Sequence, residues 1–261
     1  MEPKAIELNG KPLAAARGPA VCAPLVGRDQ AQLEAEARAV AAKGPDLLEW
    51  RVDFFEALGD TAAVLRTASA IRAAAPQLPL LFTRRSQREG GQPIALTEAE
   101  VVALYRAVCS ARAVEMVDFE MGNAAADVQA VRECSRAEGI ALVLSYHNFN
   151  ETPAVRELVE RLHQAQRLGA DVAKVAVMPR AAQDVLRLLE ATGQASAELS
   201  IPVVSMSMGS WGSVSRLCGG VFGSAMTFAV GQSSSAPGQM PIEDVRAGLQ
   251  MLARAMGNKG S

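Results

Sequence analysis

Short apolar runs alternate along the chain with longer segments in which apolar side chains recur every three or four positions. A short uninterrupted apolar run is typical of a buried strand, whereas a spacing of three to four is typical of an amphipathic helix. The pattern predicts eight strands, at residues 20–26, 47–52, 78–84, 114–119, 140–145, 172–178, 201–208 and 221–230.

Seven helices are predicted between and after these strands, at residues 31–42, 61–75, 98–110, 124–138, 155–168, 181–192 and 242–256. Helix-start signals support this reading, since Asp60 precedes the second helix and Thr97 with Glu100 forms a capping box at the third. Only the crossover between the last two strands is weak. Residues 209–220 leave room there for about two helical turns, around 214–218.

Strands that alternate with helices pair in parallel, and eight such units in 261 residues predict a (β/α)8 TIM barrel. The alternative is a doubly wound open sheet, which usually carries a glycine-rich phosphate fingerprint that this sequence lacks. An Asn9-Gly10 turn between apolar pairs predicts a β-hairpin within residues 1–18 that closes the bottom of the barrel. We therefore expect residues 1–261 to form a single barrel domain.

Polar residues gather at the predicted carboxyl ends of the strands, where the active sites of such barrels lie. Glu49, Arg51 and Asp53 end the second strand, and the strand period of two places them on one face, which we expect to point into the barrel mouth. The other strand ends with polar side chains are 83–91 for the third, Asp118 and Glu120 for the fourth, and 145–147 for the fifth.

Charge, hydropathy and cysteine content argue against nucleic-acid-binding, membrane and secreted proteins. The 26 basic and 28 acidic residues are nearly balanced and form no basic block, so we expect no nucleic-acid partner. No apolar stretch reaches the roughly 18 residues of a membrane helix, and the N-terminus lacks a secretion signal. The four cysteines (Cys22, Cys109, Cys134 and Cys218) are widely spaced and predict reduced thiols. We expect a soluble, cytoplasmic protein that does not bind membranes.

Lys174 is the only lysine between residues 44 and 258, in a chain with five lysines and 21 arginines. It lies in an apolar strand and shares one face with Val172, Ala176 and Met178. One interpretation is a barrel lysine in an ion pair, with Glu120 as its partner. The other is a Schiff-base nucleophile, because mostly uncharged neighbours and nearby arginines favour a neutral amine, which arginine cannot supply.

His147 ends the predicted strand next to the one that carries Lys174, so the two side chains can face each other across the barrel mouth. A base with a near-neutral pKa suits proton removal beside an imine. The other histidine, His163, lies in a charged amphipathic helix, and we expect it to have no catalytic role.

Three arginines, Arg51, Arg85 and Arg216, are predicted at or near the mouth. Arginines that converge on a neutral lysine indicate an anionic, hydroxylated small-molecule substrate held by bidentate hydrogen bonds. Residues 232–240 follow the last strand and are predicted to form a lid over this substrate, with Ser235 and Gln239 as hydrogen-bonding tips.

Nine short motifs, in order over about 200 residues, together resemble the type I 3-dehydroquinate dehydratase family. They are LEWRVD at 48–53, LFTRRS at 81–86 with EGG at 89–91, VDFE at 117–120, SYHNF at 145–149, AKVAVMP at 173–179, SMSM at 205–208, SRL at 215–217, FGS at 222–224 and SAPGQ at 235–239. Each motif alone is weak, and their shared order carries the resemblance.

The resemblance implies dehydration of 3-dehydroquinate to 3-dehydroshikimate, the third step of the shikimate pathway, without cofactor or metal, in an enzyme that is commonly a homodimer. Lys174 matches the imine-forming lysine, and His147 matches the general acid and base. Glu89 matches the carboxylate that orients this histidine, and Arg216 matches the clamp on the substrate carboxylate. The remaining matches are contacts to the substrate carboxylate or hydroxyls: Glu49, Arg51, Arg85, Ser235 and Gln239.

Three positions depart from the family pattern. Ala23-Pro24 replaces a substrate-facing serine of some relatives, Arg84 stands where an aromatic side chain is common, and residues 209–211 differ from the Ala-Lys-Thr type. None of them belongs to the set of Lys174, His147 and Arg216, so we expect an active enzyme.

Two other functions remain open. A class I aldolase or transaldolase also forms an imine on the sixth strand, and it would need a phosphate site, which Arg216 and the Gly219-Gly220 turn could supply. That reading does not explain the polar side chains of the second and third strands. A barrel that only binds a partner would have no need of both Lys174 and His147.

Overall fold

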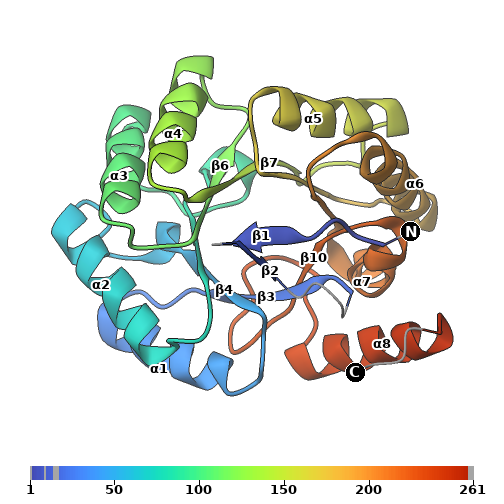
Figure 1. The fold of residues 1–261 in the computed structure, drawn as a ribbon, viewed down its shortest axis with the longest axis horizontal. Coiled ribbons are helices and arrows are strands. Elements are labelled where there is room, and N and C mark those ends of the chain that lie inside the picture. The colour runs from blue at the N-terminus through green and yellow to red at the C-terminus, as the bar shows by residue number, and fades with distance from the viewer. Residues whose placement is uncertain (1, 9, 14–17, 258–261) are drawn as a thin grey trace.

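Eight parallel strands, surrounded by helices, form the centre of the molecule (Figure 1). The computed structural model describes residues 2–8, 10–13 and 18–257. The strands hydrogen-bond in the order β10-β3-β4-β5-β6-β7-β8-β9, and the Ala225 N–H closes the ring by donating to the Val203 carbonyl at 2.7 Å. Their bounds are β3 Ala20–Leu25, β4 Leu47–Arg51, β5 Leu80–Thr83, β6 Met116–Glu120, β7 Ala141–Asn148, β8 Val172–Val177, β9 Val203–Ser207 and β10 Met226–Phe228. The predicted (β/α)8 barrel is confirmed.

The helices cover the outside of the strands (Figure 1). Their bounds are α1 Gln30–Ala41, α2 Thr61–Ala74, α3 Glu98–Ser110, α4 Ala125–Ala137, α5 Val155–Arg167, α6 Ala182–Glu198, α7 Gly209–Cys218 and α8 Ile242–Ala255. Three short 3-10 helices follow strands or helices: η1 Val52–Phe54, η2 Gln87–Glu89 and η3 Gly219–Phe222. The predicted start signals are present, since Asp60 accepts from the N–H groups of α2, and Thr97 and Glu100 form the capping box of α3.

Apolar side chains form one cluster inside the strands and another between strands and helices. On β8, Val172 and Ala176 belong to the inner cluster, whereas Ala173 and Val175 belong to the outer one. Burial of a Val or Leu side chain contributes roughly 1.5–3 kcal/mol. A one-residue slip of a strand would exchange the two faces, so this packing fixes which side chains point into the barrel. It also keeps Lys174 on the inner side.

The N-terminal hairpin closes one end of the barrel. Strands β1 Ile6–Leu8 and β2 Lys11–Leu13 pair antiparallel, and in Figure 1 they lie across the middle of the ring of helices. Ile6 is 2% exposed and packs in the inner cluster with residues that begin strands, such as Ala20 and Leu47. The hairpin therefore covers the bottom, as predicted, while Asn9 of the predicted turn lies outside the described residues.

Several predicted boundaries were wrong. The apolar stretch 221–230 is mostly 3-10 helix and loop, and β10 keeps only three residues. The helix predicted around 214–218 begins at Gly209, and α6 continues six residues past its predicted end at 192. Strand β7 continues to Asn148, so His147 lies within the strand and not at its close. Asp53 belongs to η1, after β4 has ended.

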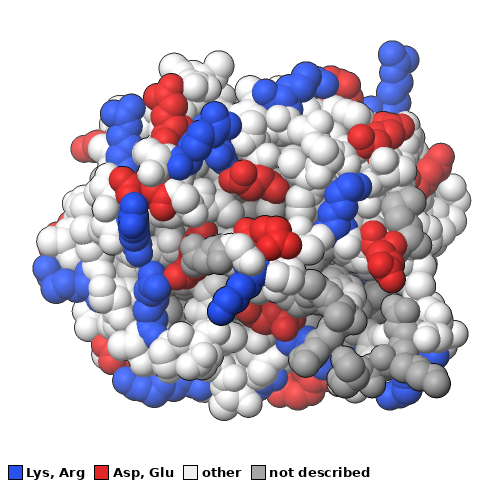
Figure 2. Space-filling model, viewed as in Figure 1, with Lys and Arg blue, Asp and Glu red and all other residues white. Residues whose placement is uncertain are grey.

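The surface matches the balanced charge. On the face shown in Figure 2, acidic and basic side chains are interspersed among uncharged ones. No helix in the described ranges has the length and apolar character that crossing a membrane requires. All four cysteines are free thiols, as predicted, with Cys22 and Cys109 buried.

Candidate active site

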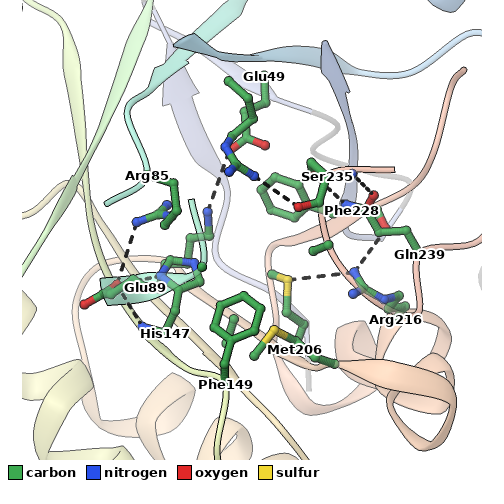
Figure 3. A pocket seen from close by; sticks show the side chains of 16 residues that line it. Glu49, Arg85, Glu89, His147, Phe149, Met206, Arg216, Phe228, Ser235 and Gln239 are labelled. Atoms are coloured by element: carbon green, nitrogen blue, oxygen red, sulfur yellow. Dashed lines mark hydrogen bonds and ion pairs between the residues drawn. The ribbon is translucent and has the colours of Figure 1, made fainter. Parts of the chain in front are cut away.

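A cavity of about 450 Å³, counting the space at its mouth, lies at the carboxyl ends of the barrel strands. Figure 3 shows Arg85, Glu89 and His147 on one side of it and Arg216, Ser235 and Gln239 on the other. All nine side chains predicted from the sequence line this cavity: Lys174, His147, Glu89, Glu49, Arg51, Arg85, Arg216, Ser235 and Gln239. The fold thus brings together residues that span 190 positions of the chain.

Glu49 and Arg51 reach the cavity because they lie on the inner face of β4, with Trp50 between them in the outer cluster. Trp50 packs edge-to-face against Phe82 with ring centroids 5.7 Å apart. Glu49 accepts a hydrogen bond from the Thr83 hydroxyl at 2.9 Å. Arg51 donates two hydrogen bonds of 2.8 Å to Asp53, so this guanidinium is fixed before any ligand binds.

Arg85 lies among three buried carboxylates. Its guanidinium nitrogens are 2.7 Å from Asp118, 3.1 Å from Glu120 and 3.8 Å from Glu89. Arg85 is 4% exposed, and although burial alone disfavours its charge, these carboxylates raise the pKa of Arg85 above its ordinary value. Its role within the resting protein is therefore to neutralise and orient these carboxylates.

Lys174 is buried on β8, 4% exposed, and it is not surrounded by mostly uncharged groups as the sequence suggested. Its Nζ donates to Asp118 at 2.8 Å, lies 3.9 Å from Glu49, and sits 4.6 Å from the centroid of the Phe228 ring. The predicted ion-pair partner, Glu120, instead binds Arg85 and the Ser86 N–H. Asp118 and Glu120 have the same parity on β6, so it is the side-chain geometry across β6, β7 and β8 that brings Asp118 to Lys174.

His147 lies beside Glu89 in this cavity. The ring Nδ1 is 2.8 Å from Glu89 Oε2, and the same oxygen accepts the His147 backbone N–H at 3.0 Å. Burial, followed by the charges of Arg85 and Lys174, lowers the pKa of His147 well below its ordinary value. Burial and then the nearby Glu120 raise the pKa of Glu89. Near neutral pH the imidazole is therefore neutral, which is the form that can accept a proton.

Arg216, on α7, is 1% exposed and has no carboxylate within ion-pair distance in the part of the chain that the structure describes. It donates to the carbonyls of Phe228 at 3.3 Å and Pro237 at 3.1 Å, and its Nε has no partner among the described residues. Burial lowers the pKa of Arg216 to about 10, so it still carries its charge at neutral pH. A buried cation without an anion is costly, and a ligand anion would relieve that cost.

The segment predicted as a lid is held over the cavity by the two predicted arginines. Arg51 donates to the Ser235 carbonyl at 3.2 Å, and Arg216 donates to the Pro237 carbonyl at 3.1 Å. Within the segment, the Gln239 amide bonds the Ser235 hydroxyl at 3.2 Å. The Gly209 N–H at the start of α7 also donates to Pro237, at 3.2 Å.

The sequence profile of one family, described as type I 3-dehydroquinase, matches residues 21–256 of this chain. The chain belongs to the type I 3-dehydroquinase family. It is 54% identical over 255 residues to the 3-dehydroquinate dehydratase of Albidiferax ferrireducens, covering 98% of this chain and 97% of that relative. It is 52% identical over 236 residues to the enzyme of that name from Geobacillus thermodenitrificans, with 90% and 91% covered. The crystal structure of 3-dehydroquinate dehydratase from Geobacillus kaustophilus has a TM-score of 0.92 at 48% identity, with 97% and 98% covered.

This type I 3-dehydroquinase carries further cavity residues that sequence reasoning did not select. Phe149, Met206 and Phe228 form apolar walls (Figure 3), and Phe149 packs so closely on Gly90 that a Cβ there would lie 2.3 Å from the ring. Met206 and Phe228 could have been found by inward parity on their strands. Asp118 does not line the cavity but binds Lys174 behind it, and its inward position on β6 was the available signal.

The three departures from the family pattern lie outside the cavity lining. Ala23 belongs to the outer cluster, and Arg84 pairs with Glu98 while its backbone N–H donates to the Tyr105 hydroxyl. Residues 209–211 form the first turn of α7, where Trp211 is 57% exposed. None of these positions contacts the cavity, in line with the expectation of an intact site.

The phosphate site that an aldolase would need is not where the sequence suggested. Gly220 packs on Pro19, which precedes β3, and an added Cβ would lie 2.6 Å from the Pro19 ring. Gly219 lies against Ser224, and neither glycine lines the cavity. The Gly219-Gly220 turn therefore lies near the start of β3 and outside the cavity that Arg216 lines.

Proposed function

We propose that this protein is a 3-dehydroquinate dehydratase that eliminates water from 3-dehydroquinate through an imine at Lys174. The product is 3-dehydroshikimate, and the reaction is the third step of the shikimate pathway toward aromatic amino acids. The observation that carries the proposal is one cavity that combines a buried amine, a neutral imidazole and a buried guanidinium that no described carboxylate pairs with. Each group matches one requirement of the reaction.

Substrate binding comes first. Arg216 supplies the charge for the substrate carboxylate, and this ion pair satisfies a cation that the resting protein leaves without an anion. The ring hydroxyls are assigned to Glu49, Arg51, Arg85, Ser235 and Gln239, which line the remaining walls. Met206 and Phe228 provide apolar surface for the carbon ring and exclude water from it.

The covalent step begins when the Lys174 amine attacks the substrate ketone. The resulting carbinolamine loses water and leaves an iminium, whose positive nitrogen accepts the electron pair released at the neighbouring carbon. His147 removes the proton from that carbon, since its Nδ1 is occupied by Glu89 and its Nε2 is free to accept. The same imidazole then returns the proton to the departing hydroxyl, and water hydrolyses the imine to release product and amine.

The proposal needs no cofactor and no metal ion, since the iminium itself is the electron sink. We expect chelators to leave the rate unchanged, and inhibition by them would require a different mechanism.

We also propose a cytoplasmic homodimer. The homodimer is what the family resemblance implies, and sedimentation of the purified chain would test that expectation.

The decisive experiment is borohydride reduction in the presence of 3-dehydroquinate, followed by peptide mass mapping. We expect a stable adduct on the peptide that contains Lys174 and no adduct without substrate. Lys43, which is only partly buried and does not line the cavity, serves as an internal control for nonspecific modification. Turnover without any adduct at Lys174 would rule out the imine mechanism.

A further inference from the structure

Asp118 connects to the catalytic groups without lining the cavity. It lies on β6, is 0% exposed, and receives three hydrogen bonds. Oδ2 accepts from Lys174 Nζ at 2.8 Å, while Oδ1 accepts from Arg85 at 2.7 Å and from the Ser145 hydroxyl at 2.6 Å. These contacts fix the plane of the carboxylate, so the position of the Lys174 nitrogen is fixed with it.

The same contacts link Lys174 to His147 through alternating charges. Asp118 joins Lys174 to Arg85, and Arg85 lies 3.8 Å from Glu89, which holds His147 Nδ1 at 2.8 Å. The nucleophile and the base therefore belong to one buried network of ion pairs and hydrogen bonds. A change in charge at Asp118 would alter the electrostatic energy of both Lys174 and His147, because screening by water is weak in this environment.

We propose that Asp118 is a positioning residue of the imine chemistry, a fixed anion that holds the Lys174 nitrogen in place and stabilises it while it is positively charged. This inference rests on the proposed function. None of the substrate contacts assigned above includes Asp118, because this residue acts through Lys174 and does not touch the substrate.

The charge balance of imine formation is consistent with an Asp118 carboxylate that stays negatively charged throughout. Overall, the Lys174 ammonium and the ketone give an iminium and water, so one positive charge stands beside Asp118 before and after. The C–N double bond forms as the ketone oxygen leaves as water, and no proton ends on Asp118. Although burial alone raises the pKa of Asp118, the charges of Arg85 and Lys174 outweigh it and bring the pKa below the ordinary value, so Asp118 is not a proton acceptor near neutral pH.

Other charged or titratable groups also face Lys174. Glu49 on β4 lies 3.9 Å from Nζ, and His147 on β7 and Cys22 on β3 are within electrostatic reach. Glu49 is the more distant carboxylate, and it is also assigned to substrate. The variant that isolates the proposed role is therefore Asp118→Asn, which keeps the shape and removes the charge.

Asp118→Asn is compared with wild type and with Glu36→Gln, a charge-removing change at another buried carboxylate. Glu36 is 6% exposed and binds the N–H groups of Val26 and Gly27, at the same end of the barrel but outside the site. We expect Asp118→Asn to lower kcat by at least about tenfold, because a charged hydrogen-bond partner of the reacting nitrogen is lost. The fraction captured by borohydride should fall with it. Glu36→Gln should retain wild-type turnover.

The pH profile separates a positioning role from structural damage. Without the Asp118 anion, protonation of His147 is less favourable, so the acid limb of kcat/KM moves to lower pH. Damage that admits water would instead relieve the burial that lowers the pKa of His147, and the limb would move to higher pH. If the acid limb of the kcat/KM profile of Asp118→Asn stays at the wild-type pH or moves to higher pH, the proposal is overturned.

A second variant keeps the test decisive if Asp118→Asn does not fold. Ser145→Ala removes a hydroxyl that donates to Asp118 at 2.6 Å and accepts from Arg85 at 3.0 Å. Because it leaves the direct bonds of Asp118 to Lys174 and Arg85, we expect kcat to fall about three- to tenfold in a folded protein. Full turnover in that variant overturns the proposal. If wild type itself neither turns over 3-dehydroquinate nor forms the Lys174 adduct, the proposed function fails; wild-type activity that is unchanged in Asp118→Asn removes only the role of Asp118.

Discussion

The carboxylate of Glu89 holds His147 at two points, the backbone N–H at 3.0 Å and the ring Nδ1 at 2.8 Å, both through Oε2. Two bonds to one oxygen fix the imidazole relative to its own backbone. With Oε2 as acceptor of both bonds, we assign the proton of the neutral ring to Nδ1, which leaves Nε2 as the acceptor. Glu89 comes from η2 after β5, so the orientation of the base depends on the loop that follows a strand two positions away in the barrel.

His147→Ala is expected to slow proton removal by about 10²-fold or more, since it deletes the general base. The imine should still form, because the Lys174 contacts with Asp118 and Glu49 do not involve the imidazole. Rapid-quench borohydride trapping and the steady-state rate separate the two steps. His163→Ala, which removes a helix-surface histidine, is the control and should behave as wild type. Undiminished turnover in His147→Ala would remove this residue from the mechanism.

The titration of His147 is measurable directly, because the chain contains only two histidines. Burial and the charges of Arg85 and Lys174 lower its pKa in the folded protein, so its ring signal in NMR should titrate well below the ordinary value of about 6.5. His163→Gln assigns the spectrum by deleting the other signal. A midpoint at or above 6.5 in the free enzyme would contradict the buried, neutral imidazole.

The lowered pKa of His147 also determines how the free energy of unfolding changes with pH. Between the lowered folded pKa and the unfolded value of about 6.5, the unfolded chain binds more protons, so the free energy of unfolding falls as pH falls through that window. His147→Asn should lose this contribution and show a flatter stability profile there. Urea titrations at a series of pH values provide the measurement.

Much of the fold followed from local pattern, and the exceptions have physical causes. The alternation of strands and helices was sufficient for the barrel, because each unit packs mainly on its neighbours. The stretch 221–230 is apolar enough for a long strand, yet only Met226–Phe228 pairs, since its first residues form η3 at the bottom of the barrel. Apolar content alone does not distinguish these states.

The candidate site was predictable residue by residue, but its electrostatics were not. Strand parity brought Lys174, Glu49 and Arg51 into one cavity. Parity could not show that Asp118, and not Glu120, would reach Lys174, because that depends on side-chain geometry across three strands. The sequence also could not show that Arg216 lacks an ion-pair partner, because that depends on whether any described carboxylate lies near it in the fold.

Arg216→Met is expected to raise the KM for 3-dehydroquinate by about 10²-fold or more, because it removes the charge assigned to the substrate carboxylate. The same change should leave the free protein as stable or more stable, since it replaces a buried cation that lacks an anion with an apolar side chain beside Met206. Thermal unfolding without substrate and steady-state kinetics measure the two effects. Loss of stability together with an unchanged KM would contradict this account of Arg216.

Gly238→Ala tests the contact between the segment 232–240 and α7. Gly238 has a φ of +77°, which favours glycine, and an added Cβ would lie 2.1 Å from the Gly209 carbonyl oxygen. The methyl group should push the segment off α7, break the 3.2 Å bond from the Gly209 N–H to Pro237, and weaken the contact of Arg216 with that carbonyl.

We expect Gly238→Ala to raise KM by about tenfold and to make residues 232–240 more sensitive to limited proteolysis. Global thermal stability should be nearly unchanged, because the segment lies over the cavity and only Met240 of it packs against an apolar cluster. Ser233→Ala, at an exposed position of the same segment, is the matched control and should match wild type in both assays. If Gly238→Ala binds substrate as tightly as wild type while its proteolysis increases, closure of this segment does not contribute to binding.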